Sequence, residues 1–152
     1  MLINQITEKE CYTILGRASI GRLGCCLNNQ PYVVPIFFAY ETGYVYAFST
    51  LGQKIKWMRT NPEVCLEVDE IATDFQWASV IVSGRYQELV EPQYTKEHAH
   101  ARALLSKRYR WWQTAAAERQ LRSGDNIDPL FFRIRVDSIT GLRAEHIESP
   151  AA

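Results

Sequence analysis

The sequence predicts a single, mainly β domain over residues 1–152, built from antiparallel strands with a few helices. Three apolar runs are separated by clusters of turn residues at 28–31 and 41–43, which is typical of an antiparallel meander. A long β-rich stretch at 77–89 is interrupted by Gly84, which indicates a bulge of the kind that barrels use to turn corners. A chain of this length is one ordinary domain.

The first half of the chain begins with a helix and continues into the meander. Thr7 and Glu10 form a capping box, in which the Thr7 hydroxyl accepts from a backbone N–H and the Glu10 side chain reaches back. The helix that follows is expected to stop near Gly16. The three strands of the meander are expected at 19–27, 32–40 and 44–49.

The second half mixes helices and strands. A short helix fits 51–60, because its apolar residues share one face and an Asn-Pro pair follows it. Another helix is expected after Pro92, whereas residues 110–128 give no clear pattern. Further strands are expected at 64–68, 77–89 and 130–136.

Composition excludes several classes of protein. The 17 Lys+Arg residues balance the 17 Asp+Glu residues, so there is no basic excess for nucleic acid or an acidic membrane. The four cysteines form no C-x-x-C pair, and the first residues lack the pattern of a signal peptide. No apolar run is long enough to cross a bilayer. We therefore expect a cytoplasmic protein with reduced thiols.

The sequence shows no self-contained catalytic machinery. His98 and His100 are two residues apart, so they diverge on a helix and cannot share a metal ion. His146 is the third histidine, and none of the three lies in a hydrolase or metalloprotease motif. No metal site is predicted. An enzyme of this kind would take its chemistry from a cofactor.

The most informative segment runs from Phe48 to Lys54. A strand ends in Ser49 and Thr50, a glycine follows, and a helix begins with Lys54 in its first turn. Hydroxyl donors, the unpaired N–H groups of a helix start and one ammonium together make a cradle for a phosphate. The alternative is an ordinary helix cap beside an exposed lysine.

Two further features are consistent with a ligand site. Pro35 interrupts an apolar strand and removes a donor from the ladder, so it belongs at an edge or a bulge. Backbone left unpaired there could face the polar edge of a flat ring, although a plain edge strand explains the same residue. Trp77 and Ser79 open the long strand, where they either contact a ligand or pack within the fold.

Taken in order, several segments resemble the pyridoxamine 5′-phosphate oxidase-like superfamily, and most closely its flavin-nucleotide-binding branch, which includes nitroimidazole-resistance proteins. The resemblance covers roughly residues 8–90. The segments that carry it are GRASIGRLG (16–24), PYVVPIFF (31–38), GQK (52–54), NPEVC (61–65) and WASVIVSGR (77–85).

The resemblance implies a split β-barrel that forms a homodimer, with flavin mononucleotide (FMN) held between the subunits. By this resemblance the phosphate is bound by Ser49, Thr50 and Lys54, with Phe48 and Gln53 beside them. The ring lies along Val34, Pro35 and Ile36, and its far side meets Trp77 and Ser79. Contacts across the subunit interface are expected from Trp111, Trp112, Arg133 and Arg135.

Two positions depart from the family pattern. Nitroimidazole-resistance proteins often carry a histidine where this chain has Phe48, and pyridoxamine-phosphate oxidases carry an arginine at the position of Gln53. Neither of those activities is therefore predicted. We expect an FMN-dependent oxidoreductase of an unknown small molecule, with NAD(P)H as a candidate electron donor. The alternatives are a haem-handling barrel with His146 as ligand, a non-enzymatic flavin carrier, and a deazaflavin in place of FMN.

Overall fold

The structure is a computed structural model, and it describes residues 1–108 and 129–148. The helices are α1 (Glu8–Arg17), α2 (Gln53–Thr60) and α3 (Thr95–Arg108). The strands are β1 (Leu2–Gln5), β2 (Ile20–Leu27), β3 (Gln30–Glu41), β4 (Tyr44–Ser49), β5 (Glu63–Thr73), β6 (Gln76–Glu88) and β7 (Leu130–Glu145).

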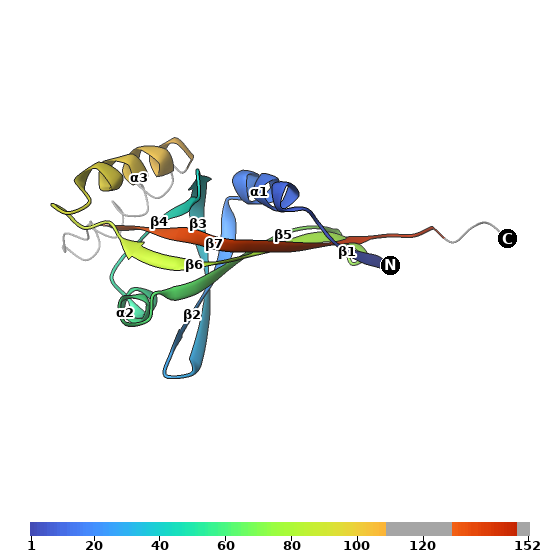
Figure 1. The fold of residues 1–152 in the computed structure, drawn as a ribbon, viewed down its shortest axis with the longest axis horizontal. Coiled ribbons are helices and arrows are strands. Elements are labelled where there is room, and N and C mark those ends of the chain that lie inside the picture. Colours follow the sequence, from blue (N-terminus) through green and yellow to red (C-terminus); the bar gives the residue numbers. More distant parts are fainter. Residues whose placement is uncertain (109–128, 149–152) are drawn as a thin grey trace, which may run out of the picture.

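All the described strands belong to one antiparallel sheet that closes on itself. Their order is β1-β7-β4-β3-β2-β5-β6, and β6 also pairs with β7, which closes the ring into a barrel. One edge of β7 pairs with β6 along most of its length, whereas the other pairs first with β4 and then with β1. Figure 1 shows β7 along the long axis of the molecule, with α1 and α3 on one side and α2 on the other. The predicted split barrel is confirmed.

Local sequence explains the tight connections. Asn28 and Asn29 both have positive φ, at 51° and 63°, and they turn β2 back into β3. Thr42 and Gly43 do the same between β3 and β4, with φ of 43° and 86°. Two positive φ values in a two-residue hairpin match the right-handed twist of the flanking strands. The predicted meander is therefore correct.

Two apolar clusters hold the helices to the sheet. The first fills the barrel, where side chains of α1 and α2 join the inward-facing residues of the strands. The second lies outside the barrel, where Ala101 and Leu105 of α3 cover Ala39, Tyr46 and Phe131. The Thr7 hydroxyl caps α1 by accepting from the Glu10 N–H at 3.2 Å. Among the described residues, no helix is long and apolar enough to cross a bilayer.

The irregularity expected at Gly84 is present. The register between β6 and β7 shifts between Ser83 and Gly84, so that Asp137 becomes the extra residue on β7. A Cβ at Gly84 would overlap the carbonyl oxygen of Arg135, so only glycine fits there. The last strand is longer than predicted: it continues past Val136 to Glu145, and its extension pairs with β1, which was not predicted.

Candidate functional site

The segment from Phe48 to Lys54 lies where β4 parts from β3. The last residue pair between these strands is Phe38–Ala47, whereas on its other edge β4 stays paired with β7 through Ser49. The turn at residues 50–52 then leads into α2, which begins at Gln53. The end of β4, the start of α2 and the neighbouring part of β3 therefore meet at one place.

This part of β3 has one open edge. From Gln30 to Phe37 the strand pairs with β2 alone among the described strands. The Phe38 N–H donates to the Ser19 carbonyl on the β2 side. Because backbone N–H groups alternate along a strand, the nitrogens of Val33 and Pro35 point to the opposite, open edge. Pro35 thus lies at an edge, as predicted, and its missing N–H costs the β2–β3 ladder nothing.

The residues on either side of Pro35 turn their side chains inward. Ile36 is buried in the barrel core and Val34 is partly buried against it, whereas Pro35 is exposed. Of these three predicted contacts, Pro35 can therefore meet a ligand through its ring and its carbonyl oxygen, whereas the backbone polar groups of Val34 and Ile36 point to β2.

The start of α2 suits an anion better than the start of α1 does. The N-cap of α2 is Gly52, which gives no side-chain hydrogen bond, and the first turn holds no acidic residue. By contrast, α1 is capped by Thr7 and carries Glu8 and Glu10 in its first turn. The first N–H groups of a helix need acceptors, and their dipoles favour negative charge. In α2 neither a cap nor a carboxylate meets this need.

Lys54 lies in that first turn and is half-buried. Burial lowers the pKa of its ammonium, and the nearby Cys25 sulfur offsets this effect only in part. It makes no ion pair with any residue in 1–108 or 129–148. A half-buried ammonium without a counter-ion favours binding of an anion. The residues present therefore fit a phosphate group.

The other residues of the segment differ in exposure. The Ser49 side chain is only 7% exposed, and its hydroxyl donates to the Thr50 carbonyl at 2.8 Å. To donate to a phosphate, the hydroxyl must therefore turn away from this carbonyl. Thr50 is partly exposed and Gln53 is exposed. Phe48 packs in the outer cluster beneath α3.

Trp77 and Ser79 lie at the far end of β6. The Ser79 hydroxyl donates to Glu67 at 3.1 Å, and Trp77 is paired with Ile71 near the β5–β6 turn. The other end of β6, at Glu88, lies beside the part of β7 that pairs with β4. Nine residues of strand separate Ser79 from Glu88, which is about 30 Å. Within one chain, Trp77 and Ser79 are therefore not brought to the phosphate cradle at Phe48–Lys54.

The arginines of β7 face outward. The Arg133 guanidinium lies over the Tyr44 ring, 4.0 Å from its centre, and its Nε donates to Gln87 at 2.8 Å. Arg135 is exposed and its Nε donates to Asp137 at 2.8 Å. The other two residues expected to contact the cofactor across the interface, Trp111 and Trp112, lie outside the described residues.

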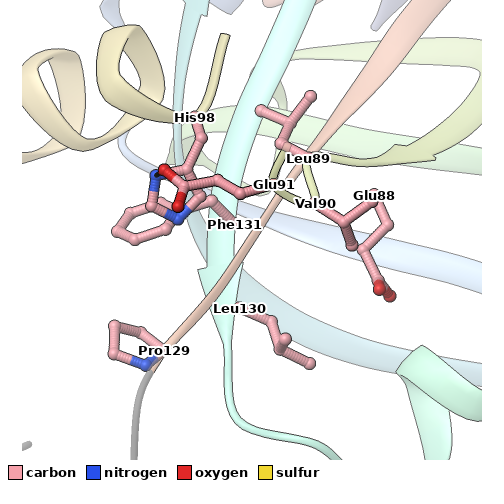
Figure 2. A pocket seen from close by; sticks show the side chains of 8 residues that line it. All are labelled: Glu88, Leu89, Val90, Glu91, His98, Pro129, Leu130 and Phe131. Atoms are coloured by element: carbon pink, nitrogen blue, oxygen red, sulfur yellow. Dashed lines mark ion pairs between the residues drawn. The ribbon is translucent and has the colours of Figure 1, made fainter. Parts of the chain in front are cut away.

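A hollow that no sequence motif indicates lies beside the same end of the barrel. It has a volume of about 320 Å³ and lies between the end of β6, the start of β7 and α3 (Figure 2). Its lining comes from three distant segments, which no motif connects. The lining residues are Glu88, Leu89, Val90, Glu91, His98, Pro129, Leu130 and Phe131.

Within the described ranges, no three His, Cys, Asp or Glu side chains are placed to hold a metal ion. The exposed His146 ring contacts Phe75 edge-on at 5.8 Å.

Comparison with known proteins agrees with this fold. An uncharacterised protein of Rhizobium meliloti (strain 1021) is 40% identical over 147 residues, which cover 95% of this chain and 97% of that protein. The crystal structure of an FAD-binding protein from Mesorhizobium loti matches with a TM-score of 0.77 and 37% identity, over 96% of this chain and 99% of that one. A candidate 5-nitroimidazole antibiotic resistance protein from Bacteroides thetaiotaomicron shares the fold, with a TM-score of 0.66 and 20% identity over 96% and 93% of the two chains. Residues 7–143 match the family model described as pyridoxamine 5′-phosphate oxidase, and the chain belongs to this family.

Proposed function

We propose that this protein is a flavin-dependent oxidoreductase that binds a flavin by its riboflavin phosphate part, which FMN and FAD share. One observation carries the proposal: as far as residues 1–108 and 129–148 show, the uncapped start of α2, with the unpaired ammonium of Lys54, lies beside the open edge of β3. An anion site next to unpaired strand backbone suits a ligand with a phosphate at one end and a flat polar ring at the other.

The chain's own residues bind and orient the cofactor. Lys54 and the first N–H groups of α2 hold the phosphate, and Thr50 adds a hydroxyl. The open edge of β3 at Val33–Pro35 faces the ring, whose polar edge the Val33 N–H can contact. When bound, the flavin supplies hydride and electron transfer. The FAD-binding relative from Mesorhizobium loti supports a flavin in this fold.

We also propose a homodimer that buries the outer face of β2, β3, β5 and β6. This face exposes large apolar side chains, among them Ile20, Val33 and Ile81, which are 44%, 65% and 48% exposed. It is hollowed by about 440 Å³ over Gly24, Cys65 and their neighbours. Exposed apolar surface with such a hollow is typical of protein interfaces. In the dimer, Trp77 and Ser79 would approach the flavin bound mainly by the other subunit.

The visible spectrum of the purified protein is the first test. Oxidised flavin bands support the proposal, a Soret band indicates haem, and a colourless protein that does not take up added FMN refutes the flavin site. A flavin-loaded sample should then consume NADH or NADPH in the presence of an electron acceptor. Flavin binding without any turnover would indicate a carrier rather than an oxidoreductase.

The dimer is tested separately by light scattering coupled to size exclusion. Ile81→Asp places a charge in the middle of the proposed interface and should give monomers. Val90→Asp is the matched control, because Val90 is similarly exposed, at 40%, but lies at the other end of the barrel. If Ile81→Asp has the same mass as the unmodified protein, this face is not the interface.

A further inference from the structure

The hollow in Figure 2 lies next to the proposed phosphate cradle. Leu130, which lines it, is directly paired with Ser49 at the end of β4. Neighbouring strands are about 4.8 Å apart, so the hollow begins one strand away from the cradle. The sheet order β7-β4-β3 places the hollow on one side of β4 and the open edge of β3 on the other.

Because of this order, the two ends of a ligand held at the end of β4 would lie on opposite sides of that strand. A flavin ring on the open edge of β3 leaves the β7 side of its phosphate unoccupied by residues 1–108 and 129–148. Any group attached to the far side of that phosphate would extend toward Leu130 and the hollow. A volume of about 320 Å³ is at the lower end of the range for small-molecule sites.

The lining of the hollow suits a nucleoside. Leu130 and Val90 provide apolar surface, and the His98 ring meets the buried Phe131 ring edge-on at 4.9 Å. In Figure 2 the Glu91 carboxylate lies beside the His98 imidazole, and its Oε1 is 3.8 Å from His98 Nδ1. The Glu91 side chain is 59% exposed, so its oxygens remain accessible as acceptors.

The second carboxylate of the lining is already engaged. Glu88 accepts two hydrogen bonds from Arg59, at 2.8 and 3.0 Å, and one from the Tyr86 hydroxyl at 2.7 Å. These partners lower the pKa of Glu88 and balance its charge. In Figure 2 its carboxylate points away from Glu91 and His98. Glu91 is thus the lining carboxylate that can receive the hydroxyl or amino donors of a nucleoside.

We infer that this hollow binds the adenosine half of a dinucleotide flavin, with Glu91 accepting from the ribose hydroxyls or the adenine amine. The inference rests on the proposed flavin site and specifies its natural ligand as FAD. Carboxylates accept from ribose hydroxyls in other dinucleotide sites. The apolar side chains of Val90 and Leu130 would cover part of the adenine ring.

The test compares FAD and FMN binding to the same full-length apoprotein, measured by flavin fluorescence. FAD should bind at least about tenfold more tightly than FMN. Glu91→Ala should weaken FAD binding about tenfold and leave FMN binding unchanged. Val90→Trp should do the same by filling the hollow. Neither residue has a role in the FMN part of the site.

The matched control is Glu97→Ala, which removes one negative charge close by on α3 without touching the hollow. Loss of a negative charge strengthens the attraction of an anionic ligand, so weaker FAD binding in Glu91→Ala alone indicates a lost hydrogen bond. If FMN and FAD bind equally, or if both hollow variants bind FAD normally, the inference is wrong although the flavin site stands. If neither flavin binds, the proposed function itself fails.

Discussion

A half-buried ammonium at Lys54 should affect both the stability of the apoprotein and its affinity for flavin. Replacing Lys54 by methionine separates these two effects. Methionine keeps the length and helix propensity of the side chain and removes its charge. Because burial lowers the pKa of Lys54 and no described carboxylate balances its charge, the apoprotein gains nothing from this ammonium. We expect Lys54→Met to leave the free energy of unfolding unchanged or to raise it by up to about 1 kcal/mol. That corresponds to an increase in Tm of about 2–4 °C.

Flavin binding should change in the opposite direction. A hydrogen bond to a charged group contributes about 1.5–3 kcal/mol, and about 1.4 kcal/mol is tenfold in Kd. The affinity for FMN should therefore fall about 10- to 100-fold, as measured by quenching of flavin fluorescence. Lys56→Met is the control, since Lys56 is exposed in the same helix and should have little effect. If Lys54→Met binds FMN as tightly as the unmodified protein, the phosphate does not lie at α2.

Three further predictions use the same structure. The affinity for FMN should be constant from about pH 6, where its phosphate loses the second proton, up to the lowered pKa of Lys54. Above this pKa it should fall, because the neutral amine no longer attracts the phosphate; titrations of Lys54→Met should lack this alkaline decrease. Gly52→Ala should fold normally, since an added Cβ meets nothing closer than the Thr50 carbonyl at 4.0 Å. It should weaken FMN binding about tenfold, because the Cβ enters the space in front of α2. Unchanged binding would place the phosphate elsewhere. Gly84→Ala should lower the free energy of unfolding by about 3 kcal/mol or more in urea denaturation, because a fixed backbone carbonyl occupies the space. Gly16→Ala, where an added Cβ has open space, is its control and should not destabilise the protein.

Sequence patterns predicted those parts of the fold that depend on one or two neighbouring residues. The meander could be predicted because Asn28, Asn29 and Gly43 are residue types that tolerate the positive φ values of tight hairpins; Thr42 also adopts a positive φ, without such a preference. The bulge at Gly84 could be predicted because a glycine inside a strand usually marks a close backbone approach. The end of β7 could not, because Asp137 and Ser138 look like turn residues, whereas the strand continues past them: Asp137 is the extra residue of the bulge, and Ser138 pairs with Ser83 of β6.

The candidate site was predictable only in part, for the same reason. The cradle lies on one continuous segment, so its order along the chain is visible in the sequence, although the burial of Ser49 is not. The position of Ser79 far from the cradle depends on the length and register of β6. The hollow near Glu91 combines residues almost forty positions apart, and only the closed barrel brings them together.

The pairing of β7 has a consequence for the order in which the protein assembles. This strand joins β6, β4 and β1, so the barrel stays an open sheet until its residues have been synthesised. Contacts between segments so distant in sequence slow folding and leave unpaired edges exposed in the meantime. During translation the emerging meander would expose free strand edges at β4 and β6, and chaperones that shield such edges should raise the yield of native protein.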